Sequence, residues 1–444
     1  MPAASLSPEP VSRALRPPPP AGLRWLVLVL VSLALFGNYY AYDAIGPLAD
    51  NLQRLLGYTD TQLGMLNAIY SLPNVAMVLV GGVVVDRLGA RRAVVIFTAI
   101  CLVGAILTAI SPAFPVMATG RLVFGLGAES MIVAITTLLG QWFAGRELGF
   151  AFGINISIAR MGSYSADMST TWAKPLYDSG WQAPLWLAAS MVAMALVAAL
   201  TYHGVERTAA RRYELAALPP TGRIVWRDLL RFDRSYWYVA GICVAFYSVI
   251  FPFRSTFAIK YFQHAHELSL QEAGSINGVV YLAAIVATPL FGLLVDRVGG
   301  RALALIVGSA LLVAVFPLLA WSDASLWIPT ILIGISFSLV PAVLWPAIAY
   351  LSPAARLGTA FGLMTLLENV GMMLANLGAG WLNDANGAGA ANPAGYTPML
   401  LMFGLLALAG VVFAVLLRQR ELGPAGHGLE GLRPAPKAAP PAIA

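Results

Sequence analysis

The sequence predicts an all-α membrane protein with twelve transmembrane helices in two six-helix pseudo-repeat bundles. Of the 444 residues, 59% are hydrophobic and only 11% are charged, whereas a soluble domain carries about 25% charged residues. Apolar runs of about 20 residues, the length that crosses a bilayer, follow one another along the chain. A pattern of glycine, acid and arginine also returns after 210 residues, which indicates two halves that are built alike.

A polar insert at 204–234 divides the twelve apolar runs into two groups of six. Each run can form one spanning helix, because a helix satisfies its own backbone hydrogen bonds in lipid. The predicted spans are 24–49, 61–85, 91–111, 116–141, 148–173, 182–203, 235–260, 271–295, 302–322, 326–351, 357–381 and 396–418. The predicted domains are a disordered tail (1–23), the N-terminal bundle (24–203), a cytoplasmic central loop (204–234), the C-terminal bundle (235–418) and a disordered tail (419–444).

Arginine and lysine determine the predicted orientation. With both termini inside, 21 of the 27 lysines and arginines fall in cytoplasmic tails and loops, 3 in the opposite loops and 3 within helices. Because positively charged loops stay in the cytoplasm, we expect both termini and the central loop there. The 24 arginines against 3 lysines are typical of GC-rich bacteria, which favours a bacterial inner or plasma membrane.

The repeated pattern lies in the loops after the second and the eighth span. Its two copies are Asp86, Arg87, Gly89 and Arg91, and Asp296, Arg297, Gly299 and Arg301. An acid at the C-terminal end of a helix opposes the helix dipole unless it serves a neighbouring helix. The glycine permits a tight turn, and the arginines can bind carboxylates or carbonyls of the facing half. A loop that only fixes topology is the simpler alternative, but repetition in register favours a latch between the halves.

Gly82-x3-Asp86-Arg87-x-Gly89-x-Arg91-Arg92 resembles the signature loop of the major facilitator superfamily. Together with the twelve spans in two repeats, this resemblance covers residues 24–418. It implies two bundles that rock about a central site, each with an inverted three-plus-three repeat. It also implies that the repeated loop latches the cytoplasmic side in the outward-open state.

Two charges are predicted to lie near the middle of the bilayer, where charges are costly and usually functional. From the ends of their helices, Glu129 lies about 20 Å deep and Arg160 about 18 Å deep, so we expect them to meet. Glu368 of the other half lies at a similar depth. The acid and the base either neutralise each other or open to bind a zwitterion. A dipeptide would suit the second alternative, since two extended residues span about 7 Å.

A closer resemblance supports the zwitterion. The stretches Gly120–Ser130 and Ser157–Ser163, in the helices of Glu129 and Arg160, are similar to the lysosomal dipeptide uniporter branch of this superfamily. Further similar stretches are Tyr42-Asp43, Tyr70-Ser71-x-Pro73-Asn74, Phe251-Pro252-Phe253, Ile276–Tyr281 and Leu344-Trp345-Pro346. The resemblance implies passive transport of dipeptides, with Glu129 holding the amino end and Arg160 the carboxyl end.

Other polar and aromatic residues within the spans are candidates for the same cavity, although tyrosines also collect at membrane interfaces. The additional substrate-binding candidates are Tyr42, Tyr70, Tyr247, Asn277, Tyr281, Trp345 and Asn369. The candidates for a proton-linked step are Asp43, Asp167 and Glu368. We expect Asp167 to balance the charge of Arg160, and Arg121 to have a structural role near the outer mouth.

We expect a monomer that needs no cofactor, metal or nucleic acid. Two cysteines in apolar runs cannot form a disulfide framework. The two neighbouring histidines at 264 and 266 are weak evidence for a metal site, and a solvated loop is the favoured interpretation. No phosphate loop or nucleophile–base pattern suggests an enzyme. The competing functions are another major facilitator carrier, including a proton-linked one, and a non-transporting membrane sensor. The first span lacks the Glu-x-x-Glu-Arg run of proton-coupled peptide carriers, which argues against obligatory proton symport.

Overall fold

The computed structural model describes residues 17–144, 146–215, 232–353 and 356–431. These ranges are almost entirely helical, and twelve helices of 19 to 31 residues make up most of them. Ten helical segments among the described residues are long and apolar enough to cross a membrane. The other two long helices are α3 and α6, and α6 carries polar residues through its middle.

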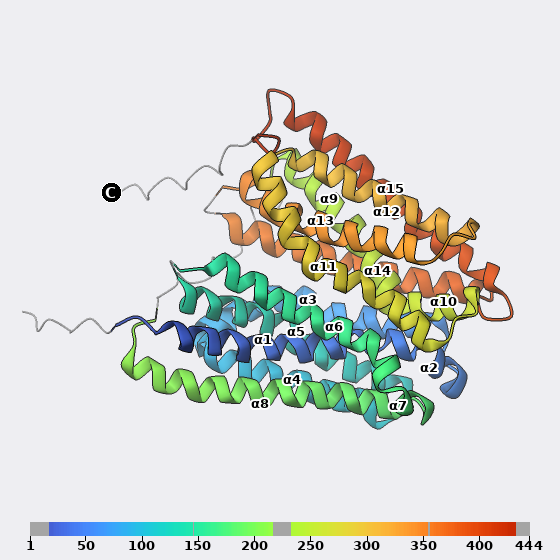
Figure 1. Cartoon of the computed structure of the whole chain (residues 1–444), viewed down its shortest axis with the longest axis horizontal. Coiled ribbons are helices and arrows are strands. Elements are labelled where there is room, and N and C mark those ends of the chain that lie inside the picture. The colour runs from blue at the N-terminus through green and yellow to red at the C-terminus, as the bar shows by residue number, and fades with distance from the viewer. Residues whose placement is uncertain (1–16, 145, 216–231, 354–355, 432–444) are drawn as a thin grey trace, which may run out of the picture.

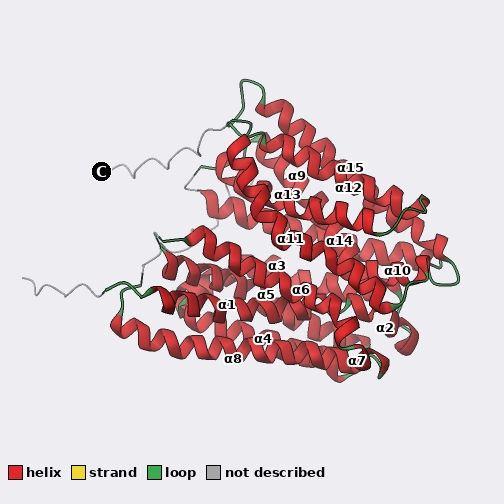
Figure 2. Cartoon of the chain, in the orientation of Figure 1, coloured by secondary structure: helices red, strands yellow, loops and turns green. Residues whose placement is uncertain are grey.

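Each half of the chain contributes six long helices, and the two sets of helices form two bundles (Figures 1 and 2). The N-terminal bundle contains α1 (Ala21–Asp43), α3 (Asp60–Leu88), α4 (Ala90–Ile110), α5 (Phe114–Phe143), α6 (Leu148–Trp172) and α8 (Gln182–Arg212). The C-terminal bundle contains α9 (Arg234–Pro252), α11 (Leu270–Val298), α12 (Arg301–Trp321), α13 (Trp327–Leu351), α14 (Leu357–Ala385) and α15 (Thr397–Glu421). Shorter elements are η1 (Gly46–Leu48), α2 (Ala49–Leu56), α7 (Lys174–Asp178), η3 (Phe253–Phe257), α10 (Ala258–His266) and η5 (Pro393–Tyr396).

The predicted repeat extends to the way in which equivalent helices begin. Helices α3 and α11 start and end at the same offset of 210 residues. Both open with a capping box, formed by Thr59 with Gln62 and by Ser269 with Glu272. In this arrangement two backbone N–H groups that the helix itself leaves unpaired are satisfied reciprocally.

All twelve predicted spans correspond to long helices, but two of the spans are interrupted. In the first span, α1 ends at Asp43, and the chain continues through the short helices η1 and α2. The seventh ends at Pro252, and the following residues Phe253–Phe257 form a π-helix before α10 begins. A π-turn often marks a functional site, and this one carries Arg254.

The polar connections differ from the prediction at two places. Helix α8 continues to Arg212, into the predicted central loop, whose residues 216–231 lie outside the described chain. Helix α15 continues to Glu421, and the segment 422–431 then packs against the C-terminal bundle with Leu429 fully buried. The predicted disordered tail at 419–444 is therefore ordered as far as 431, while 432–444 and 1–16 lie outside the described residues.

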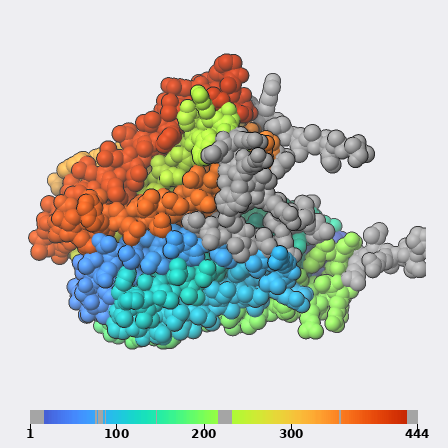
Figure 3. All heavy atoms as spheres, turned by 180° about the vertical axis from the view of Figure 1, so that it is seen from behind, coloured from blue at the N-terminus to red at the C-terminus, as the bar shows by residue number. Residues whose placement is uncertain are grey.

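The two bundles contact each other through α3 against α14 and α6 against α11. They approach most closely at the end that holds α2 and α10 and diverge towards the end where α1 begins and α15 finishes (Figure 1). Seen from behind, the orange α14 lies directly on the blue segments of the N-terminal bundle (Figure 3). We refer to these two ends as the closed end and the termini end.

Glycines permit the close crossing of α3 and α14 near the closed end. A Cβ atom on Gly64 would overlap the carbonyl oxygen of Asn376, and one on Gly380 would overlap that of Asp60. Since a side chain at either position would push two backbones apart, these glycines allow the bundles to meet backbone to backbone.

The two copies of the repeated loop have different surroundings. Gly89 and Gly299 both adopt positive φ, of 79° and 75°, as the predicted tight turn requires. Arg301 binds Asp296 at 3.0 Å and lies over the ring of Tyr350, and its loop is covered by the segment 422–431 through Arg301 N to Leu429 O at 3.3 Å.

In the first copy, Arg87 is exposed and Arg91 is half-buried; the side chain of Asp86 lies outside the described part. Because the two halves diverge at this end, the latch stays a prediction.

Candidate functional site

Glu129 and Arg160 come from neighbouring helices of the N-terminal bundle, α5 and α6, as expected, but they do not meet. No ion pair joins them in the described chain, and Glu129 has no hydrogen-bond partner there. Glu129 is half-buried and lies within electrostatic reach of Tyr39 and Glu368. Sequence depth alone predicted the contact, but the guanidinium of Arg160 binds another helix.

Arg160 instead reaches across to α11 of the other bundle. Its Nη1 donates to the carbonyl oxygen of Ala284 at 2.7 Å and to Thr288 Oγ1 at 2.5 Å. The guanidinium also lies over the ring of Phe337, 5.2 Å from its centroid. These contacts fix the guanidinium plane between the bundles with 8% of the residue exposed.

Glu368 of α14 is the second acid at this level. It and Glu129 belong to opposite bundles and lie within electrostatic reach of each other. Tyr39 of α1 is half-buried and within reach of Glu129, Arg160 and Glu368. The polar end of the first span is the sequence signal for Tyr39, although the site residues predicted there are Tyr42 and Asp43.

A buried charge cluster joins the bundles on the closed-end side of this site. Arg254 of the π-turn binds Asp43 at 3.1 Å and Asp167 at 2.9 Å, and all three side chains are at most 1% exposed. Asn277 donates to Asp167 at 3.1 Å, and Tyr281 donates to Asp43 at 3.3 Å. The expectation that Asp167 balances Arg160 is therefore wrong: its partner is Arg254, which the sequence placed in a helix without a role.

Aromatic side chains form a layer beside the cluster. Tyr42 contacts Tyr70 at 4.7 Å between ring centroids and Phe251 of the other bundle at 6.1 Å. Phe251 stacks on Tyr247 at 5.8 Å and meets Phe337 edge to face at 5.9 Å. The aromatic layer thus extends from the N-terminal bundle to Phe337, the ring over which the Arg160 guanidinium lies.

The remaining candidates take up hydrogen bonds with protein partners. Trp345 donates to the Tyr247 hydroxyl at 2.8 Å, and Asn369 accepts from Asn74 of the opposite bundle at 3.1 Å. Arg121 donates to the carbonyl oxygens of Leu66, Ala41 and Tyr42, which agrees with the structural role expected of it.

Further interactions hold the closed end together. Lys260 forms a fully buried ion pair with Asp60, and Asp384 of α14 accepts from the backbone N–H groups of Asp60 and Thr61, both at 2.8 Å. An acid at the start of a helix is favourable because it complements the dipole and pairs free N–H groups. Here the acid that caps α3 comes from the other bundle.

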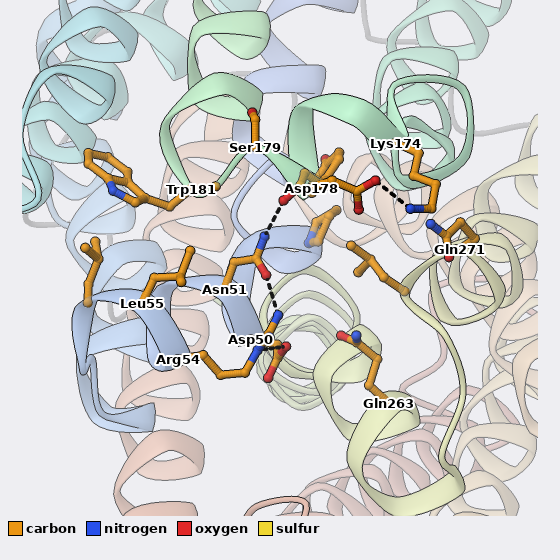
Figure 4. Close-up of a pocket in the computed structure, with 15 residues that line it drawn as sticks. Asp50, Asn51, Arg54, Leu55, Lys174, Asp178, Ser179, Trp181, Gln263 and Gln271 are labelled. Atoms are coloured by element: carbon orange, nitrogen blue, oxygen red, sulfur yellow. Dashed lines mark hydrogen bonds and ion pairs between the residues drawn. The ribbon is translucent and has the colours of Figure 1, made fainter.

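His264 is not the solvated loop residue that we expected. Its Nε2 lies 3.0 Å from Asp50 of the N-terminal bundle, and its Nδ1 lies 2.8 Å from the Tyr396 hydroxyl. Asp50 also lines a polar surface pocket of about 770 Å³ between α2, α7 and α10 (Figure 4). The charged groups of this pocket are paired within their own helices, Arg54 with Asp50 and Lys174 with Asp178.

Comparison with known proteins identifies the family. The family model described as Major Facilitator Superfamily matches residues 31–366 and 253–442. The chain belongs to this superfamily. It is 32% identical over 377 residues to the lysosomal dipeptide transporter MFSD1 of Homo sapiens, covering 82% of this chain and 81% of that protein. The MFSD1 protein of Danio rerio is 33% identical over 378 residues, with coverage of 82% and 81%.

Solved structures of other superfamily members confirm the fold. A bacterial homologue of the human lysosomal transporter Spinster, in an inward-facing and unoccupied conformation, superposes with a TM-score of 0.73 at 14% identity over 90% of this chain and 98% of that one. The D323A mutant of the nucleoside transporter NupG gives 0.71 at 15% identity over 89% and 99%. The predicted fold class and resemblance are confirmed: this is a multi-pass membrane protein of a transporter superfamily, whose matched relatives are transporters and not enzymes.

Proposed function

We propose that this major facilitator protein carries dipeptides across the membrane by alternating access, as facilitated diffusion without ion coupling. One observation carries the proposal: Glu129 and Arg160 both lie within electrostatic reach of Tyr39, but they form no ion pair with each other among the described residues. Buried opposite charges normally neutralise each other, since an unpaired charge is costly in a low dielectric. An acid and a base that do not pair with each other at one site could instead each bind the opposite charge of a zwitterionic ligand.

In this proposal Glu129 accepts the ammonium group of the dipeptide and Arg160 binds its carboxylate. The ends of an extended dipeptide lie about 7 Å apart, so one ligand can reach two groups that do not touch. Two relatives at 32–33% identity are named as dipeptide transporters, which supports the same class of substrate. The other substrate-binding candidates then act indirectly: Asn277 and Tyr281 belong to the charge cluster, and Tyr42, Tyr70 and Tyr247 to the aromatic layer.

The arrangement of the two bundles supports alternating access. Ion pairs of Arg254 and Lys260, all buried, join the bundles at the closed end, whereas the bundles diverge at the termini end. With the termini in the cytoplasm, as the arginine distribution favours, this conformation is inward-facing. The reverse state would break these pairs and bring the repeated loops to the facing bundle as latches. We propose that the protein works as a monomer in a bacterial plasma membrane.

Dipeptides should stabilise the purified protein against thermal unfolding, because a ligand that binds only the folded state raises its stability. At a dipeptide concentration of about 100 times the Kd, the gain is about 2.7 kcal/mol, which a melting curve in detergent resolves. Free amino acids and C-amidated, N-acetylated dipeptides at equal concentration are the controls. If single amino acids or neutral drugs raise the melting temperature and dipeptides do not, the proposal is wrong.

A proton-linked carrier is the second candidate, favoured by Glu368. This acid belongs to the other bundle, lies within electrostatic reach of Glu129 and has no basic partner among the described residues. Two neighbouring carboxylates in a buried site favour protonation of one of them, since the two negative charges repel. A dipeptide gradient across proteoliposomes that contain a pH-sensitive dye separates the two functions. We expect dipeptide uptake without internal acidification and with the same rate in Glu368→Gln; acidification that disappears in this variant would establish proton coupling.

A further inference from the structure

We infer that Thr288 of α11, in the C-terminal bundle, positions Arg160 to bind the substrate carboxylate. Both bundles then contribute residues to the recognition of the carboxylate. The inference rests on the proposed function and deepens it. Thr288 lies outside every group that the sequence singled out, because it is an ordinary polar residue in an apolar span. Only its contact with Arg160 at 2.5 Å indicates a role.

The guanidinium donors of Arg160 are divided between the protein and the space between the bundles. A guanidinium has five N–H donors in a fixed plane. The two on Nη1 are directed to Ala284 O and Thr288 Oγ1. Nε and Nη2 have no partner in the part of the chain that the structure describes, and neither is among its fully buried, unpaired polar atoms. Of the remaining three donors, Nε–H and one N–H of Nη2 therefore lie on one open edge.

This open edge has the geometry that a carboxylate requires. Nε–H and one N–H of Nη2 are parallel, and paired parallel donors bind both oxygens of a carboxylate at once. Because the plane is held on one side by Nη1 and on its face by the Phe337 ring, the edge keeps one direction. Preorganisation of this kind strengthens binding, since less side-chain freedom is lost when the ligand arrives.

The same contacts connect the ligand to the conformation of the carrier. A carboxylate on the Nε–Nη2 edge leaves Nη1 bound to α11, so that ligand, α6 and α11 form one hydrogen-bonded chain across the bundle interface. In the reverse state, any separation of α6 from α11 would release Nη1 and loosen the edge. Thr288 is thus a positioning residue, which acts on the ligand through Arg160 and does not touch it.

The test compares Thr288→Val, which removes the hydroxyl at similar shape, with Thr288→Ser, which keeps it. Titrations that follow the melting temperature give affinities for a dipeptide, its N-acetylated form and its C-amidated form. In Thr288→Val we expect affinity for the two ligands with a free carboxylate to fall about tenfold, as when a hydrogen bond to a charged group is lost. The amidated ligand should be unaffected, and Thr288→Ser should bind all three within about twofold of the unmodified protein.

Any other result for Thr288→Val contradicts the inference, and the pattern of affinities shows which part of it is wrong. An equal loss for free and amidated ligands in Thr288→Val would mean that the hydroxyl only supports the fold, and no loss at all would mean that Arg160 is held without it. If Thr288→Val does not fold, as judged by its melting curve without ligand, Thr288→Ala takes its place in the same comparison. If the unmodified protein binds no dipeptide, the proposed function fails and the inference fails with it. If the unmodified protein does bind dipeptides, an equal loss for free and amidated ligands, or no loss, in Thr288→Val overturns the inference alone.

Discussion

Replacing Glu129 by glutamine should lower the affinity for dipeptides with a free amino terminus about 10- to 100-fold, the range for a hydrogen bond to a charged group. The amide keeps the shape of the side chain but removes the charge that would attract an ammonium group in the low dielectric between the bundles. N-acetylated dipeptides, which carry no ammonium group, should bind both forms equally. Titration of the melting temperature, or competition against a labelled dipeptide, measures the two affinities.

A mirror-image variant makes this prediction specific. Arg160→Gln should lower the affinity for ligands with a free carboxylate by a similar factor, because it removes the positive charge that would bind the carboxylate. The affinity for C-amidated dipeptides should not change. Glu147→Gln, the same chemical change at an exposed position outside the site, is the matched control and should bind as the unmodified protein does. Equal losses for free and acetylated dipeptides in Glu129→Gln would show that the acid supports the fold and does not hold an amino group.

Replacing Arg254 by methionine should open the closed end. The change leaves Asp43 and Asp167, both at most 1% exposed, without their cation, and breaking a buried pair in this way costs about 3–5 kcal/mol. Because the penalty is relieved when the bundles separate and water reaches the carboxylates, the equilibrium should shift by more than about a hundredfold towards the reverse state. This is the largest conformational effect that we expect from a single substitution.

Spin labels on Leu55→Cys and Glu267→Cys, two exposed positions at the closed end on opposite bundles, would report the opening as a longer distance. Cys101 and Cys243 are fully buried and should not take up the label. Arg420→Met is the control, since Arg420 pairs with Asp233 within the C-terminal bundle. Adding Asp167→Asn to Arg254→Met should recover part of the closed population, because one buried charge fewer remains. An unchanged distance in Arg254→Met would show that the cluster does not hold this end closed.

The depth of each charged residue could be predicted from the sequence, but not the direction in which it points. Counting 1.5 Å per residue from a helix end gave similar expected depths for Glu129 and Arg160, which lie on consecutive helices. The rotation of a helix about its axis depends on how its side chains pack against other helices, which no single span reveals. For this reason Arg160 was expected beside Glu129 and lies against Thr288, and Asp167 was expected beside Arg160 and lies against Arg254.

The sequence by itself determined the class, the twelve helices and the two-fold repeat. These features are local: an apolar run must form a helix in lipid because only a helix satisfies its own backbone there, and caps and turns involve residues a few positions apart. Only the tertiary structure decided the partners of the buried charges. Arg254 lies 211 positions from Asp43 and 87 from Asp167, and such pairs form only when the two bundles meet.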